Sequence, residues 1–197
     1  SSDLSYQDTR NKNLLNTGYE ARMLNGWTAN IRVCLSKEFT FRINLIQMYK
    51  KSMSEYFPKQ DYKIMNLSGE PSLSWQPSNK YRISIRWMYS NKENRNGEVN
   101  EKAFKNQAGS ELRYNILSKG SFSAKINYIN IKFAYPENTP IAYEMIEGLK
   151  PGDNVVWNIS FQQNLSEYLQ MIFLYDGRSS PGSKIIHTGS VQLRAYF

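Results

Sequence analysis

The sequence predicts an all-β protein in which about ten strands run antiparallel in up-and-down order. Three observations predict this class: apolar and polar residues alternate with period two, short and long connections alternate along the chain, and many strands reach about 10 residues, whereas globular strands average about 5 to 6. No helix has a strong pattern, although residues 144–149 (EMIEGL) can form one turn.

The clearest alternation is YRISIRWMY at 81–89, where Tyr81, Ile83 and the following odd positions share one face and Arg82 and Arg86 lie on the other. Strict period two over this length is typical of a strand. Polar-apolar alternation of the same kind predicts further strands at 27–35, 39–45, 112–116, 155–161 and 190–197.

Three other segments, at 62–76, 122–133 and 168–175, predict strands with less regular patterns. The apolar positions of 122–133 change face near Tyr128, and 62–76 contains Gly69 and Pro71, which predicts a bulge or an edge strand.

At the start of the chain, a short strand at Thr17–Met23 is expected to join the strand at 27 through an Asn25-Gly26 turn. Residues 1–16 are polar and unpatterned, which predicts a mobile or capping segment in front of a β-domain at 17–197.

The connections divide into two kinds that alternate along the chain. Short ones at 36–39, 77–80, 118–121 and 165–168 predict hairpins. The long polar ones are at 51–61, 90–103, 135–153 and 177–186. One end of the sheet is therefore expected to be plain and the other elaborated.

The composition contains a mismatch: aromatic residues make up 14% of the 197 residues, yet mean hydropathy is −0.62. Alternating strands explain it, because they average to polar while one face is apolar. Together with the strand length, this face predicts a transmembrane β-barrel, with a soluble β-sandwich that binds carbohydrate or protein as the alternative. Aromatic girdles are expected at both rims, from Phe39, Tyr81 and Tyr168 beside short turns and Trp87, Tyr89, Phe133, Tyr135 and Tyr175 beside long loops.

The net charge of +8 permits an anionic partner such as lipid headgroups, lipopolysaccharide or nucleic acid. Nucleic acid is disfavoured, because the aromatic and basic residues lie on opposite faces. Six arginines are expected on the inward face of the strands. They either make an electropositive lumen or pair with inward carboxylates to fill a closed one, and the second hypothesis is favoured. They are Arg32, Arg42, Arg82, Arg86, Arg113 and Arg194.

The last strand places Val191, Leu193, Ala195 and Phe197 on one face. This ending resembles the C-terminal β-signal of Gram-negative outer-membrane proteins, although Ala195 replaces the usual aromatic at the third position from the end. The resemblance implies an outer-membrane location, contact with lipid and lipopolysaccharide, recognition by the barrel-assembly machinery, and short turns on the periplasmic side.

The final hairpin at 175–197 also resembles the ends of large outer-membrane barrels. Because the chain starts abruptly and lacks a signal peptide, the C-terminal part of a larger barrel is slightly preferred over a small barrel. The function expected is a membrane-spanning anchor or a channel or transport component, and the alternative is a barrel subunit of a secretion or assembly machine.

Catalytic and metal-binding patterns are not found in the sequence. One histidine, His187, and one cysteine, Cys34, cannot supply a zinc site or a Cys/His catalytic pair. Glu144, Glu147 and Asp153 could bind a cation, but they lack a ligand spacing and are more simply solvated loop charges. We therefore expect neither an enzyme nor a cofactor.

Overall fold

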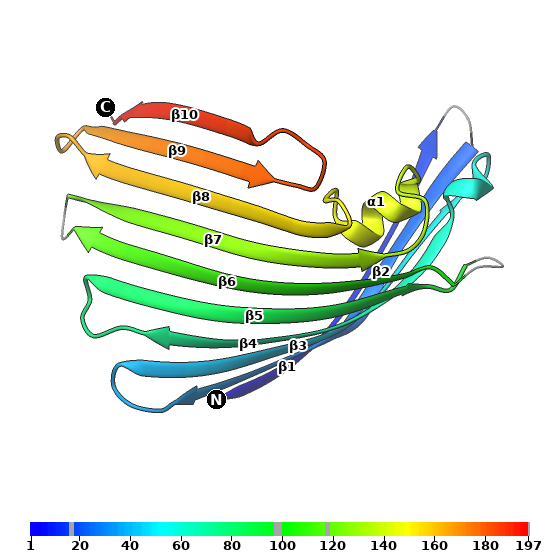
Figure 1. The fold of residues 1–197 in the computed structure, drawn as a ribbon, viewed down its shortest axis with the longest axis horizontal. Coiled ribbons are helices and arrows are strands. Elements are labelled where there is room, and N and C mark those ends of the chain that lie inside the picture. The colour runs from blue at the N-terminus through cyan, green and yellow to red at the C-terminus, as the bar shows by residue number, and fades with distance from the viewer. Residues whose placement is uncertain (16–17, 97–99, 117–118, 197) are drawn as a thin grey trace.

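The computed structural model describes residues 1–15, 18–96, 100–116 and 119–196. It confirms the predicted class: ten strands form a single sheet in sequence order, each antiparallel to its neighbours (Figure 1). The strands are β1 (Ser2–Leu15), β2 (Gly18–Cys34), β3 (Phe39–Ser54), β4 (Tyr62–Trp75), β5 (Tyr81–Asn94), β6 (Lys102–Ile116), β7 (Gly120–Phe133), β8 (Gly152–Asn164), β9 (Leu169–Ser179) and β10 (Ile186–Ala195), joined by a 3-10 turn η1 (Pro58–Gln60) and a helix α1 (Pro140–Ile146).

The sheet is strongly curved but open. In the described residues β1 pairs with β2 alone and β10 with β9 alone, so one edge of each remains uncovered. Both chain ends lie at the end of the sheet with the short turns, and α1 lies at the opposite end (Figure 1). We call the face that carries α1 the inner face and the opposite one the outer face.

The N-terminal expectation is wrong: residues 2–15 are strand β1, paired with β2 along its whole length. Asn25 and Gly26 also form no turn, because they lie inside β2 opposite Asp8 and Gln7. An Asn-Gly pair makes a hairpin only where its two flanks pair with each other, and here β1 and β3 supply the partners instead. Thr17 lies outside the described residues.

β4 is neither an edge strand nor bulged, contrary to expectation. It lies between β3 and β5, and its pairing with β5 resumes at Ser72 opposite Arg86 in the register set by Gly69 opposite Tyr89. Glu70 and Pro71, between these pairs, have no partner in β5, because Pro71 has no N–H to donate to the ladder. The register is the same on both sides of this gap.

β7 likewise contains no bulge. Its register with β6 is continuous from Gly120 opposite Ile116 to Phe133 opposite Ala103. The apolar positions change face because α1 covers the inner face at this end, where Ile129 and Ile131 are buried. Phe133, expected in the outer girdle, belongs to the inner face and packs against this cluster.

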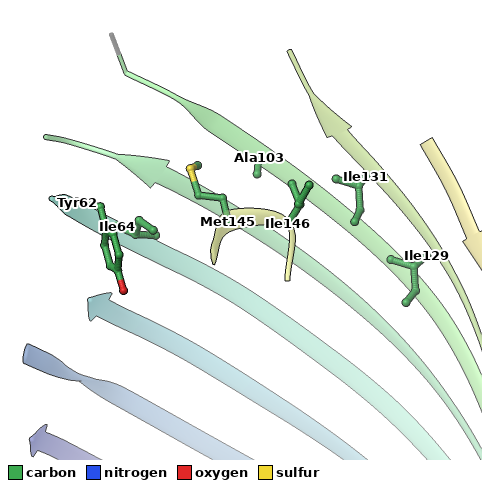
Figure 2. Packing of buried hydrophobic residues seen from close by; sticks show 7 residues of the cluster. All are labelled: Tyr62, Ile64, Ala103, Ile129, Ile131, Met145 and Ile146. Atoms are coloured by element: carbon green, nitrogen blue, oxygen red, sulfur yellow. The ribbon is translucent and has the colours of Figure 1, made fainter. Parts of the chain in front are cut away.

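α1 lies within the long β7–β8 connection, and three of its residues, Ala142, Met145 and Ile146, are buried. Thr139 caps its start, since its hydroxyl accepts a hydrogen bond of 3.0 Å from the Ala142 N–H, and Pro140 supplies a preset φ. The sequence placed a single turn a few residues later, at 144–149. Figure 2 shows the cluster of Met145 and Ile146 with residues of β4, β6 and β7: Tyr62, Ile64, Ala103, Ile129 and Ile131.

Within the described ranges, no helix combines the length and apolar character needed to cross a membrane.

Candidate functional site

The strand register places all six predicted arginines on the inner face. Residues directly opposite each other on neighbouring strands share a face, and Arg32 lies opposite Arg42, while Arg82 lies opposite Arg113. Ser72 faces both Arg42 and Arg86 from β4. The remaining one, Arg194, lies opposite Gln170 at the β10 edge.

Four of these arginines line one cavity of about 250 Å³ on the inner face. Arg32, although adjacent to Arg42 in register, and Arg194 do not line it. Four arginines and two glutamates leave the lining with a net charge of +2. The lining residues are Arg42, Glu70, Ser72, Ser74, Arg82, Ser84, Arg86, Glu111 and Arg113.

The arginines of this cavity are only partly neutralised. Arg113 forms an ion pair with Glu111, and Arg86 donates a hydrogen bond of 3.0 Å to the Asn127 side-chain oxygen. Within the described chain, the side chains of Arg42 and Arg82 have no hydrogen-bond or ion-pair partner. Neutralisation by inward carboxylates therefore accounts for some of the cluster and leaves positive charge available to an anion.

Gly109 gives Arg86 room to reach Asn127. It lies between them in register, opposite Arg86 on β5 and opposite Asn127 on β7. A Cβ atom at Gly109 would be 2.5 Å from the Asn127 side-chain oxygen and 3.0 Å from Arg86 Nε. The missing side chain thus lets the guanidinium lie across β6.

Lysines of three strands hold α1 on the inner face at the long-loop end. Lys50 Nζ lies 2.5 Å from a Glu144 carboxylate oxygen. The Glu147 carboxylate forms ion pairs with Lys92 Nζ at 2.7 Å and with Lys105 Nζ at 2.6 Å. The sequence reading missed these lysines, whose only signal was their inner-face position near strand ends.

The carboxylates Glu144, Glu147 and Asp153 do not gather around a cation site. Asp153 lies on the outer face of β8, where it accepts hydrogen bonds of 2.6 Å from Tyr128 and 2.6 Å from Asn130. Among the described residues, no group of three or more His, Cys, Asp or Glu could hold a metal ion.

The charge state of Glu147 depends on opposing effects. Burial acts to raise the pKa of this carboxyl, but the hydrogen bonds and charges of Lys105 and Lys92 outweigh it and leave the pKa below its ordinary value. Glu147 also adopts a left-handed backbone, φ 58°, just after α1. This conformation ends the helix, and the Glu147 backbone N–H donates to the Tyr143 carbonyl oxygen.

Of the eight expected girdle residues, five lie on the outer face by register: Phe39, Tyr81, Trp87, Tyr89 and Tyr175. Tyr168 lies in the turn before β9, Tyr135 lies in the β7–β8 connection, and Phe133 is on the inner face. At the short-turn end, Phe39 stacks on Trp75 with ring centroids 6.3 Å apart and Tyr81 on Tyr114 at 4.8 Å. The second girdle was expected at the long-loop rim, but Trp87 and Tyr89 lie in the middle of β5, because the strand continues to Asn94. The strands therefore project well past the second aromatic level.

The outer face between these levels is apolar and exposed. Ile85 and Trp87 each keep 61% of their surface accessible, and Leu193 keeps 66%. Contiguous exposed apolar surface of this kind marks contact with lipid or another protein. It continues across the β10 edge through Val191, Leu193 and Ala195, whereas Phe197 lies outside the described residues.

The single histidine and cysteine lie apart from the cavity. His187 is in β10, where its ring stacks on Tyr175 at 6.0 Å and its Nδ1 lies 2.8 Å from the Tyr175 hydroxyl. Cys34 is exposed at the end of β2 and is not part of a disulfide.

Comparison with known proteins identifies the fold. No family model matches the chain, and no curated protein matches it either. Among solved structures, the NanC porin aligns with a TM-score of 0.53 and 11% identity over 100% of this chain and 97% of that one. The CymD monoaromatic hydrocarbon channel aligns with a TM-score of 0.54 and 7% identity over 98% and 69%. The chain therefore has the all-β fold of outer-membrane porins and channels.

Proposed function

We propose that this chain forms the wall of an outer-membrane channel whose inner face favours anionic solutes. The cavity lined by Arg42, Arg82, Arg86 and Arg113 carries the proposal, because it places a net positive charge on the face that an enclosed barrel turns toward its lumen. The porin and channel folds of its structural neighbours support a transport role rather than catalysis.

The outer face supports the membrane part of the proposal. Its exposed apolar side chains lie between two levels of aromatic rings, as lipid and its two interfaces require. In hydrocarbon an unpaired strand edge is costly, so the outer edges of β1 and β10 must be covered in the membrane. They pair either with each other or with strands of a larger barrel.

Ion selectivity in planar bilayers tests the lumen. Under a salt gradient, the reversal potential of the wild-type protein is expected to indicate anion preference, and Arg42→Gln with Arg82→Gln is expected to reduce it toward zero. The control is Lys132→Gln with Lys37→Gln, which removes the same charge from the outer face and a turn. Equal potentials for both double variants, or no conductance at all, contradict a channel with an arginine-lined lumen.

A soluble binding module is the competing function and has its own test. The membrane protein is expected to require detergent and to migrate faster on SDS gels unheated than boiled. Folded, monodisperse protein in plain buffer contradicts the membrane proposal as a whole. If the protein inserts into membranes but never conducts, the anchor or the barrel subunit of a secretion or assembly machine becomes the better assignment.

A further inference from the structure

We propose that the outer surface of β1–β4 holds one membrane lipid with an anionic, phosphate-bearing headgroup, at the end of the sheet with the long loops. This inference rests on the proposed membrane location and adds a defined ligand site to it. The site consists of three hollows in series along the outer positions of β3, at Leu45, Gln47, Tyr49 and Lys51.

The first two hollows are suited to an acyl chain. One, of about 440 Å³, is lined by apolar side chains including Leu45 and Leu67 and opens over Gly69, which has no side chain to fill it. The next, of about 320 Å³, shares Trp27 and Gln47 with it and continues past Tyr49 and Met65. From Leu45 to Lys51 the strand rises about 20 Å, comparable to the half-thickness of the hydrocarbon core, about 15 Å.

The third hollow, of about 250 Å³, combines apolar walls with cationic groups. Its outer-face walls include Ala21, Met23 and Met53, and Lys51 and Lys12 contribute positive charge, whereas the charge of Arg10 is paired with Asp8. A headgroup joined to an acyl chain needs this combination of apolar and positive surface.

Lys51 supplies the observation that points to an anion. It lies directly opposite Lys63 on the outer face, and both side chains are half-buried. Like charges directly opposite on neighbouring strands destabilise a sheet, and neither lysine has a side-chain partner in the described residues. A bound phosphate between them would remove this repulsion.

The neighbouring carboxylates do not meet this need, because they are engaged elsewhere. Asp8 is paired with Arg10 at 2.9 Å, and Glu93 is paired with Arg95 at 3.1 Å and Lys102 at 3.3 Å. The local charge around Lys51 and Lys63 therefore remains positive.

Native mass spectrometry of the full chain in detergent tests the site, with long-chain phosphatidylglycerol as the probe and phosphatidylcholine of matched chains for comparison. Lys51→Gln with Lys63→Gln is expected to weaken phosphatidylglycerol binding about thirtyfold, since each lysine near a membrane surface contributes roughly a fivefold change. The control, Lys37→Gln with Lys132→Gln, removes equal charge and is expected to leave binding unchanged.

Three outcomes overturn the site: equal binding to both double variants, equal affinity for the two lipids, or equal affinity for short-chain and long-chain phosphatidylglycerol. The last outcome identifies a phosphate site without an acyl groove, as does complete displacement by inorganic phosphate. Failure of the membrane proposal is recognised separately, because the protein would then be folded and monodisperse without detergent.

Discussion

Replacing Glu147 by glutamine is expected to loosen α1 from the inner face. The change keeps the size of the side chain and removes its charge, so both ion pairs to Lys92 and Lys105 are lost. The two lysine side chains then remain close together, each only 12% exposed, without their shared counter-charge. The apolar contacts of Met145 and Ile146 are unaffected and keep the helix partly docked.

The size of the effect follows from the exposure of the three groups. The Glu147 side chain is 48% exposed, so solvent screens one side of each pair. Because both lysines are only 12% exposed, each pair is assigned the upper value for such pairs, about 1 kcal/mol, and the loss is about 2 kcal/mol in total. This corresponds to a roughly thirtyfold larger population of undocked helix.

Thiol labelling measures that population directly. Ala142 lies on the buried side of α1, at 0% exposure, so Ala142→Cys in a Cys34→Ser background reacts only when the helix undocks. Its rate, divided by that of an exposed Tyr143→Cys at the same pH, is expected to rise about thirtyfold with Glu147→Gln. Glu137→Gln, an exposed change in the same loop, serves as the control.

The docking of α1 is also expected to depend on pH, and the pKa of Glu147 sets the direction of this dependence. Because the folded pKa of Glu147 is lowered, its contribution to docking is complete above the ordinary glutamate pKa of about 4.3 and is lost as the pH falls through the lowered value. Wild-type labelling should therefore approach that of the variant below about pH 4. Equal normalised rates in the two proteins at pH 7 refute the assignment.

Two further predictions concern the arginine cavity and the chain terminus. Gly109→Val is expected to break the Arg86–Asn127 hydrogen bond and lower stability by about 1 to 3 kcal/mol. The loss of stability is measured as a lower midpoint temperature for the change in gel mobility on heating. The control is Gly189→Val, whose Cβ position meets no atom closer than 3.9 Å. Equal midpoint temperatures for the two variants reject the role of Gly109. Deletion of Phe197 is expected to impair outer-membrane assembly while synthesis continues, and normal insertion in membrane fractions removes the β-signal interpretation.

The inner and outer faces were predictable because their signal is local. In β5, the alternation from Tyr81 to Tyr89 assigns Arg82 and Arg86 to one face and the aromatic residues to the other. Side chains on a strand alternate whatever its partners are, so pattern alone decides the face. The same reasoning placed all six arginines on one face, although only the register brought four of them around one cavity.

The errors arose where distant partners decide local structure. Residues 2–15 lack an apolar pattern, yet they form a strand because they pair with the edge of β2 that β3 leaves free. Asn25-Gly26 has the sequence of a turn and extends through β2, because pairing on both sides outweighs turn propensity. The face change near Tyr128 needed no bulge, because α1 provides an apolar environment on the inner face.

By itself, the sequence determined the strand class, the up-and-down order and the two chemically distinct faces, since these depend on period two and on the lengths of connections. The tertiary structure alone decided that Lys92 and Lys105 meet Glu147, that Lys51 faces Lys63, and that Gly109 leaves space for Arg86. Each of these contacts joins residues of different elements. Their positions depend on the register of paired strands and on the path of a long loop, which no local pattern encodes.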